Sequence, residues 1–357
     1  MKEQFENILS KPLGALDKEE MDLIMYHAVH FPDGIKGALW GEIIMRAIEE
    51  EKALKGANDA ANLINKAYIE FDKVYPQLFE EKSALLKKAC LFCLEENDQA
   101  NAHQHMETYI YNAIAQVHYN AKNEGMPYYS FRSFSKYSLQ DIENETISLA
   151  HPREFNDPLD TILLYWLDTE IRNATEDNIR LRYRLLMKKV AEHIKIRCLI
   201  AGKEDDGREV PIEELNVLMW AHYANCHKGF CVKYEFDSKL FESNITNNKI
   251  QLIDKITYSD VIDLKDEPSI RKALLEKSDF WKYEREMRFL LFDCSGDDKD
   301  FPTVYCPGAA KAIYLGVKCS DADRRAMEKA IGDKNIPIYQ MSVDEIKLTR
   351  FKKTLIG

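Results

Sequence analysis

The sequence lacks both a long apolar run and the glycine-rich motifs that mark the common nucleotide-binding folds. No apolar stretch among its 357 residues approaches the roughly 18 residues that a membrane-spanning helix needs. No Gly-x-Gly-x-x-Gly, Walker loop or Gly-x-Ser-x-Gly occurs, which argues against Rossmann, P-loop and α/β-hydrolase folds. Residues 1–10 have neither the basic start nor the apolar core of a signal peptide. We therefore expect a cytoplasmic protein without a membrane partner.

An excess of positive charge is also missing. The formal net charge is −11, and residues 1–120 alone carry 12 Lys and Arg against 20 Asp and Glu. This acidic first third repels nucleic acids and anionic membranes, whereas the remainder is close to neutral. The charge argues against general nucleic-acid binding but leaves room for a local basic pocket that binds one anionic ligand.

The eight cysteines show no pattern typical of a metal site or a disulfide framework. They are scattered through the chain, mostly inside apolar segments, which is typical of buried reduced thiols. Cys90 and Cys93 form a C-x-x-C, but it lies in a helical run with no second pair nearby. We expect no metal.

Apolar residues recur at three- and four-residue spacing from Glu19 to about Asn123, which predicts a helical first third. Breakers divide it into antiparallel helical pairs of about 35–40 residues each, a length typical of tetratricopeptide-like repeats. The alternative is a plain helical bundle that supports the rest of the chain. On either interpretation we expect residues 1–125 to sense or bind a protein partner.

A Gly/Pro break at 123–127 predicts a domain boundary. The following residues, 126–357, alternate between strand-like and helix-like patterns. This order predicts an α+β fold overall, in which the helical region precedes a mixed α/β domain with a bent sheet of short strands. One of its predicted helices runs from Ser269 to Trp281.

The segment 218–230 concentrates aromatic and titratable groups and includes Trp220, His222, Tyr223 and Lys228. It reads as a helix that is stopped by Gly229 and followed at once by a half-buried strand. Such crowding is typical of a binding site, with His222 as an acid, base or hydrogen-bonding group, and also of a hydrogen-bonded core corner.

Further candidates lie on the first strand and in the proline-bracketed loop 151–160. The guanidinium of Arg132 suits a phosphate or carboxylate, although the residue could instead pair with Asp157 or Asp160. Asn156 and Asp157 could bind a ligand or form a turn.

Glu284 and Glu286 are one residue apart at the start of a predicted strand, so both should point to one face. They could act on a substrate. Alternatively, they could pair with the neighbouring basic side chains on a solvated strand edge.

Five segments in chain order resemble the bacterial domain-of-unknown-function family 2971 over roughly 128–320. They are Tyr-x-Phe-Arg-Ser-Phe at 129–134, Pro-x-Glu-Phe-Asn-Asp-Pro at 152–158, Leu-Met-Trp-x-His-Tyr at 218–223, His-Lys-Gly-Phe at 227–230 and Trp-x-Tyr-Glu-x-Glu-x-Arg at 281–288. This family name implies no activity.

The order of these groups is also similar to that in ADP-ribosyltransferases. The resemblance implies that NAD+ is the substrate, that Arg132 binds it and that Tyr223 stacks on nicotinamide. Glu286 would be catalytic and Glu284 would act on the acceptor. The Ser-Thr-Ser motif of those enzymes is missing, because Phe230-Cys231-Val232 stands in its place.

The leading hypothesis is therefore an NAD+-dependent ADP-ribosyltransferase-like effector, in a setting such as bacterial antiphage defence or toxicity. One alternative is a non-catalytic protein that binds a nucleotide or metabolite. A second is a nuclease or phosphotransferase, since His222, Lys228, Arg132 and Asp157 could handle phosphate.

Overall fold

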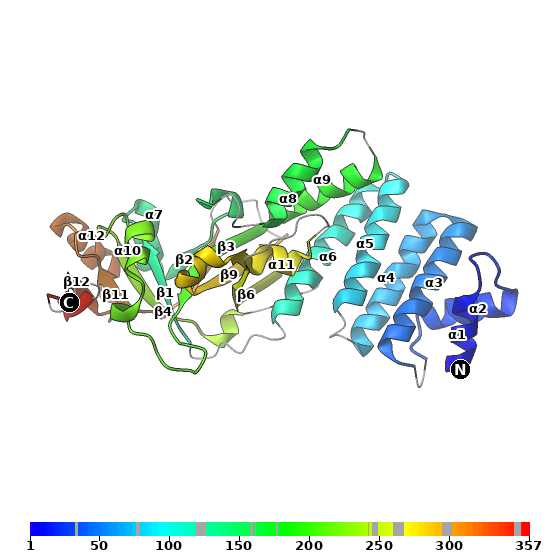
Figure 1. Ribbon diagram of the computed structural model, residues 1–357, viewed down its shortest axis with the longest axis horizontal. Coiled ribbons are helices and arrows are strands. Elements are labelled where there is room, and N and C mark those ends of the chain that lie inside the picture. Colours follow the sequence, from blue (N-terminus) through cyan, green and yellow to red (C-terminus); the bar gives the residue numbers. More distant parts are fainter. Residues whose placement is uncertain are drawn as a thin grey trace.

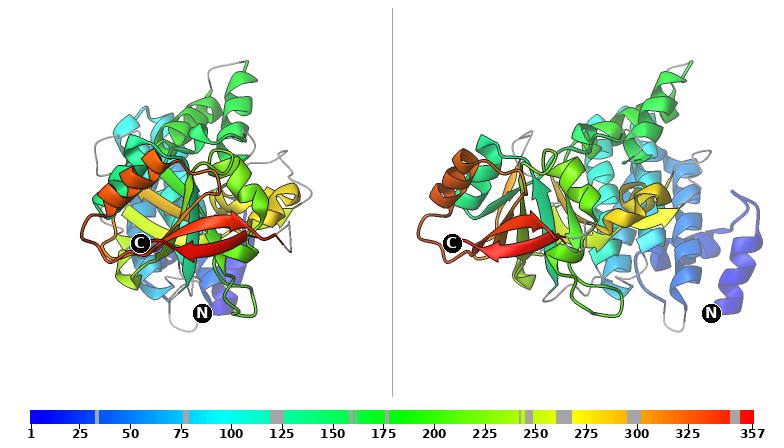
Figure 2. Two further views of the ribbon diagram at one scale, coloured as in Figure 1. Left: turned by 90° about the vertical axis from the view of Figure 1, so that its left-hand side faces the viewer. Right: turned by 60° about the vertical axis from the view of Figure 1, so that its left-hand side comes forward.

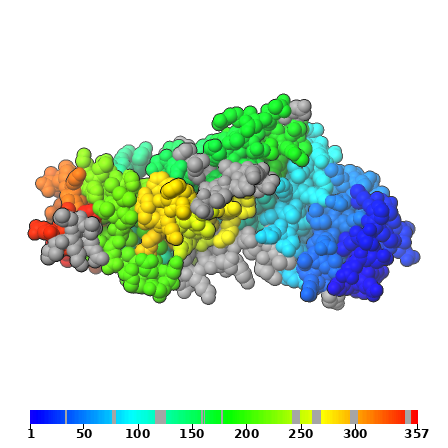
Figure 3. Space-filling model, in the orientation of Figure 1, coloured from blue at the N-terminus to red at the C-terminus, as the bar shows by residue number. Residues whose placement is uncertain are grey.

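The computed structural model describes residues 1–32, 35–75, 79–118, 126–157, 160, 162–175, 178–241, 243–244, 249–259, 268–294, 302–345 and 351–357. Six helices come first, and a mixed α/β region around an open, mostly antiparallel sheet of short strands follows (Figure 1). This confirms the predicted fold class. The molecule is elongated, with the two termini at opposite ends (Figures 1 and 3). Most of the predicted domain boundary falls within residues 119–125, outside the described residues.

The six N-terminal helices follow one another side by side. Their bounds are α1 Lys2–Ser10, α2 Lys18–Ala28, α3 Gly37–Lys55, α4 Ala57–Val74, α5 Phe79–Glu95 and α6 Gln99–His118. Asp17 caps α2 with a complete capping box, and Gly56 adopts a positive φ of 102° to separate α3 from α4. Each of α2 to α6 packs on its neighbour in sequence, as the periodicity predicts (Figure 1).

The main sheet has nine strands in the order β13-β12-β11-β4-β1-β3-β9-β6-β5. Their bounds are β1 Pro127–Arg132, β3 Ile194–Ala201, β4 Phe230–Glu235, β5 Ser243–Asn244, β6 Lys249–Lys255, β9 Glu286–Asp293, β11 Ala310–Leu315, β12 Ile338–Val343 and β13 Phe351–Leu355. Two small sheets join β2 (Thr146–Ser148) to β10 (Thr303–Tyr305) and β7 (Thr257–Ser259) to β8 (Glu276–Ser278).

The sheet opens between its central strands. β1 pairs with β4 along its whole length, and β3 pairs with β9 over seven residue pairs. Between β1 and β3, however, the ladder is limited to Tyr128↔Ala201 and Tyr129↔Ile200. Beyond Tyr129 the two strands separate, and an isolated bridge from Ala150 meets β3 at Ile196. The stretch of β3 between these pairings therefore has a free edge.

Each face of the sheet has its own cover. The helices α8 (Ile162–Arg172), α9 (Ile179–Ala191) and α11 (Ile270–Leu275) join α1–α6 in one hydrophobic cluster with β3, β6 and β9. Further along the same face lies α10 (Val217–Tyr223). The opposite face is covered by α7 (Lys136–Glu143) and α12 (Asp321–Ile331). Figure 2 shows α10 and α12 on opposite sides of the sheet.

Two local predictions are wrong. The helix expected over 269–281 ends at Leu275, because Glu276 is extended and the next residues pair with β7 as β8. A 3₁₀ helix, η5, then runs from Asp279 to Glu284. The helix expected to stop at Gly229 ends at Tyr223. Among the described helices, none is long and apolar enough to cross a membrane.

Candidate functional site

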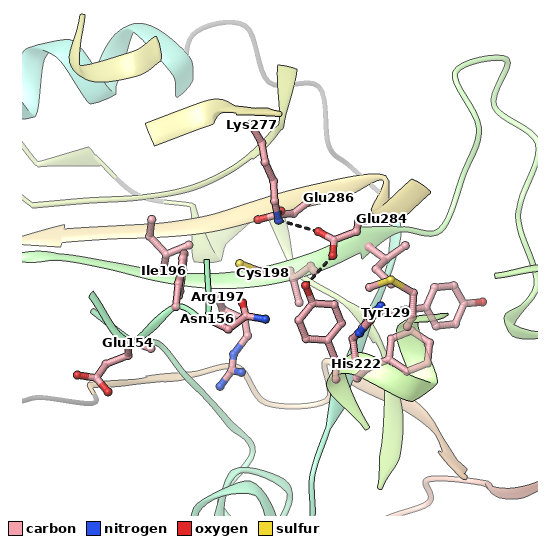
Figure 4. A pocket seen from close by; sticks show the side chains of 17 residues that line it. Tyr129, Glu154, Asn156, Ile196, Arg197, Cys198, His222, Lys277, Glu284 and Glu286 are labelled. Carbon is pink, nitrogen blue, oxygen red and sulfur yellow. Dashed lines mark hydrogen bonds and ion pairs between the residues drawn. The ribbon is translucent and has the colours of Figure 1, made fainter. Parts of the chain in front are cut away.

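A cavity of about 370 Å³ opens where β1 and β3 separate. Tyr129 and Phe131 of β1 form one wall, and residues 196–200 of β3 form another. Both faces of β3 contribute to this lining, so the cavity follows the free edge of the strand. Residues from α10, η5 and the loop 150–156 complete it (Figure 4).

Lys277 on β8 is the centre of a buried ion cluster beside the cavity. Its Nζ lies 2.7 Å from Oε2 of Glu284, 2.8 Å from Oε2 of Glu286 and 3.3 Å from Oδ2 of Asp160. All four side chains are almost fully buried. These three carboxylates raise the pKa of Lys277, although burial alone would lower it. The ammonium is therefore charged and fully occupied.

Arg288 on β9 is the second cation of the cluster. It is entirely buried, and its Nε donates to Oε1 of Glu286 over 2.8 Å. Its Nη1 donates to the carbonyl of Leu274 over 2.6 Å, and its Nη2 pairs with Oδ1 of Asp160. Both carboxylate oxygens of Glu286 are thus bound by cations, and its backbone N–H donates to the hydroxyl of Tyr258.

The cluster contains three carboxyl groups and two cations, so it carries a net charge of −1 when all five groups are ionised. Burial would raise the pKa of Glu286, but Arg288 and Lys277 outweigh it and hold the pKa at about 2. For Glu284 and Asp160 burial wins, and both pKa values are raised. Glu284 and Asp160 therefore accept a proton more readily than Glu286 does.

Glu284 is the member of the cluster that meets a group from across the cavity. The hydroxyl of Tyr223, at the end of α10, donates to Oε1 of Glu284 over 2.6 Å (Figure 4). Burial and this hydrogen bond raise the pKa of Tyr223, so the phenol remains a donor. A cavity-lining carboxyl with a raised pKa, held by a fixed donor on each oxygen, is typical of general acid–base chemistry.

The two glutamates converge for a reason that strand alternation does not supply. Only Glu286 belongs to β9, while Glu284 ends η5. Between them, Arg285 adopts a left-handed conformation with φ 51° and ψ 45°, which reverses the chain so that both carboxylates reach Lys277. They are 3% and 2% exposed, so the expected solvated strand edge is wrong. The expected pairing with a neighbouring basic side chain is present for Glu286, whose partner is Arg288.

Three more of the predicted residues line this cavity, namely His222, Tyr223 and Asn156. Asp157 and Lys228 do not line it. Trp220 points into the core instead: it is 1% exposed and lies edge-on to Phe131, with ring centroids 4.9 Å apart. It cannot offer a stacking face to a ligand in the cavity.

Arg132 is not brought to the cavity either. Alternation along β1 places it on the face opposite Tyr129 and Phe131, which line the cavity. Its Nη1 donates to Oδ2 of Asp141 over 2.6 Å, and both residues are buried. The expected convergence of Arg132 with Tyr223 and Glu286 is therefore wrong. Its partner is Asp141, whereas Asp160 binds Lys277 and Arg288.

The residues after α10 form a strained turn. Asn225, Cys226 and His227 have φ values of 46°, 53° and 69°, in the left-handed region that non-glycine residues rarely adopt. Gly229 has another role: a Cβ there would lie 2.2 Å from the carbonyl oxygen of Arg132. The glycine thus permits close backbone contact instead of ending a helix.

Sequence reasoning missed two residues at the site, Lys277 and Arg197. Lys277 fell within the predicted helix, where it reads as one solvated charge among several. Arg197 lies in the apolar strand β3, and such a charge inside a buried strand is a signal that could have marked it. Cys198, also in the lining, is no nucleophile: burial raises the pKa of its thiol well above the usual value.

Comparison with known proteins identifies one matching segment. Residues 219–289 match the model of a family described as a protein of unknown function (DUF2971). The segment contains Tyr223, Lys277, Glu284, Glu286 and Arg288, so it carries most of the ion cluster. The predicted resemblance to this family is confirmed there. No curated protein and no solved structure matches the chain, so the comparisons do not bear on ADP-ribosylation or on tetratricopeptide repeats.

Proposed function

We propose that the cavity is the active site of an enzyme that cleaves the nicotinamide–ribose bond of NAD+ and transfers ADP-ribose to an acceptor. One observation carries this proposal: Glu284 lies in the cavity wall, bound by Tyr223 on one oxygen and by Lys277 on the other. Two carboxylates and an aromatic residue that meet at one cavity suit a reaction with an oxocarbenium-like transition state.

In this reaction the bond between ribose C1′ and the nicotinamide nitrogen breaks, and its electron pair leaves with nicotinamide. Positive charge develops on the ribose. The ionised Glu284 stabilises that charge, because the cluster has one negative charge in excess of its cations. The acceptor then bonds to C1′, and its proton passes to Glu284, whose raised pKa suits it to the transfer.

Glu286 has a positioning role in this proposal. Each of its two oxygens is ion-paired with a cation, and these cations lower its pKa, which opposes proton transfer to Glu286. Glu284 is ion-paired on one oxygen only, and its pKa is raised. Glu286 holds Lys277 in place, and Lys277 in turn orients Glu284. The role of catalytic group, which the ADP-ribosyltransferase resemblance implies for Glu286, therefore moves to Glu284.

The apolar part of the lining suits the flat nicotinamide ring. Phe131, Phe155, Met219 and Tyr223 all contribute to it. A volume of about 370 Å³ lies in the range of small-molecule sites and would accommodate part of a dinucleotide. The helices α1 to α4 lie toward the other end of the molecule from α10, which contributes to the cavity wall (Figure 1), and we assign their surface to a protein partner.

The test is release of nicotinamide from NAD+ by the purified protein, alone and with a bacterial lysate that can supply an acceptor or trigger. We expect release by the wild type and a loss of about 10²-fold or more in kcat for Glu284→Gln. Glu235→Gln on β4, which alters a carboxylate that does not line the cavity, is the matched control and should retain full activity.

Equal activity of Glu284→Gln and wild type would refute the mechanism. A second candidate function, ligand binding without turnover, is favoured by the mutual pairing of charges in the cluster. It predicts that NAD+ raises the melting temperature of the protein while nicotinamide is never released.

A further inference from the structure

The cavity is lined by one arginine that pairs with no carboxylate of the described residues. Arg197 is half-buried and lines the cavity, and within the described residues its guanidinium forms no ion pair. Its one hydrogen bond there runs from Nε to the carbonyl of Ser148 over 2.7 Å. Burial, and then the nearby Arg132, lower the pKa of Arg197 to about 10, so it is still charged at neutral pH.

The carboxylate that acts on Arg197 most strongly, that of Asp141, is already ion-paired with Arg132. Its Oδ2 accepts from Arg132, from the Ser148 hydroxyl over 2.6 Å and from the Ser148 N–H over 3.1 Å. Its Oδ1 accepts from the Thr146 hydroxyl over 2.9 Å. The single negative charge of Asp141 therefore compensates Arg132 and leaves the charge of Arg197 uncompensated among the described residues. A half-buried guanidinium without a counter-ion is costly, which points to a ligand that supplies one.

Other donors lie near Arg197. Asn156 lines the same part of the cavity, and Figure 4 shows both side chains away from the end that holds Lys277 and Glu286. Along β3, the backbone groups of Ile196 and Ile200 point to the side of Ala150 and Tyr129. By alternation the peptide N–H of Cys198 points the same way, into the gap between the strands.

We propose that Arg197, with Asn156 and the Cys198 peptide N–H, binds an oxyanion of the ligand at the end of the cavity away from Glu284. The planar guanidinium still has both Nη groups to offer, which suits a phosphate or pyrophosphate in bidentate contact. The site thus selects a ligand with an anion at one end and the reacting or cation-like group beside Glu284 at the other. Glu154, also in the lining, is exposed and lies at the rim.

This inference deepens the proposed function, because the pyrophosphate of NAD+ would be the anion. It rests on the unpaired cation, however, and can be tested without turnover. The probes are inorganic pyrophosphate, ADP-ribose and nicotinamide, the last of which carries no anion. The proteins are the full-length wild type, Arg197→Met, Arg197→Lys and, as a control, Arg153→Gln, which alters an exposed arginine in the same loop region.

We expect pyrophosphate to raise the melting temperature of the wild type and of Arg153→Gln, but not of Arg197→Met. In calorimetric titrations, Arg197→Met should bind ADP-ribose about 10- to 100-fold more weakly than the wild type, the usual effect of losing a charged hydrogen bond. Its affinity for nicotinamide should be unchanged, which also shows that the cavity has folded. Arg197→Lys, with a charge but no planar fork, should be intermediate.

Two results would overturn the inference: no stabilisation of the wild type by pyrophosphate, or equal pyrophosphate and ADP-ribose binding by wild type and Arg197→Met. The proposed function fails differently. If the wild type binds pyrophosphate through Arg197 but releases no nicotinamide from NAD+, the anion site stands and the NAD+ reaction is wrong.

Discussion

The hydroxyl of Tyr223 donates a 2.6 Å hydrogen bond to Glu284, 61 residues further along the chain. This bond joins α10 to η5 across the cavity. It favours the ionised form of Glu284, as does Lys277, whereas burial favours the protonated form and is the largest effect. The pKa of this cavity-lining carboxyl therefore depends on a single hydroxyl group.

Tyr223→Phe should raise the pKa of Glu284 further, because it removes a hydrogen bond that lowers it. If catalysis needs ionised Glu284, the acid limb of the pH–rate profile lies above the ordinary value of 4.5 and moves to higher pH in this variant. The measurement is kcat/KM for nicotinamide release against pH. Tyr305→Phe, which alters an exposed tyrosine, should leave the limb in place. An unmoved limb in Tyr223→Phe would show that Glu284 does not set it.

Glu286→Gln should destabilise the fold by about 3–5 kcal/mol, because it leaves Arg288 and Lys277 short of a buried counter-charge. Glu284→Gln should cost less, since a glutamine oxygen can still accept from Tyr223 or Lys277. Urea denaturation of both variants beside the wild type measures the difference. Equal losses would contradict the distinct roles assigned to the two glutamates.

The pKa shifts of the two glutamates predict how the free energy of unfolding depends on pH. The folded-state pKa of Glu286, about 2, lies below its ordinary 4.5. Its contribution is therefore fully present above about pH 4.5 and is lost as the pH falls toward 2. Raised pKa values at Glu284 and Asp160 act oppositely, since protonation favours their folded form. We expect the stability gap between wild type and Glu286→Gln to shrink from pH 5 to pH 3 in urea titrations, and a constant gap would contradict the assignment.

Two neighbouring arginines should respond differently to truncation. Arg132→Met leaves the buried carboxylate of Asp141 without its cation and should cost about 3–5 kcal/mol. Arg197→Met removes a cation without a counter-ion and loses one bond to Ser148, so its cost should stay within about 1 kcal/mol. Thermal or urea unfolding without ligand compares them. A large loss of stability in Arg197→Met would mean that this guanidinium stabilises the fold.

Much of the architecture was predictable because it follows from local pattern. The three- and four-residue spacing of α2 to α6 and the alternation in β1, β3 and β9 are set by which side chains meet the core. Likewise, α12 begins at Asp321 because the side chain of Ser320 caps its start. At the site, sequence reasoning found Tyr223, Glu284 and Glu286. Tyr223 stands in a segment rich in aromatic and titratable residues, and the two glutamates are only one residue apart.

The remaining features depend on long-range pairing, which local pattern cannot show. The extended conformation of Glu276 and Lys277 is fixed by β7, almost twenty residues earlier, and overrides their helical surroundings. Alternation places Arg132 on the face of β1 opposite Phe131, but which of the two faces borders the cavity depends on the strands that β1 pairs with. Whether Arg197 has a counter-ion is a property of the folded chain alone, since the nearby Asp141 is ion-paired with Arg132.

The carbonyl of Leu274, which accepts a hydrogen bond from Arg288, connects the ion cluster to the N-terminal helices. Leu274 belongs to α11, and α11 packs against α6, the last of the six N-terminal helices. A displacement of α6 would therefore move an acceptor of Arg288 and, through it, the anchor of Glu286. Within the described residues, packing of α6 on α11 and the hydrogen bond from Arg288 to Leu274 thus join the helical region to the carboxylates of the cavity.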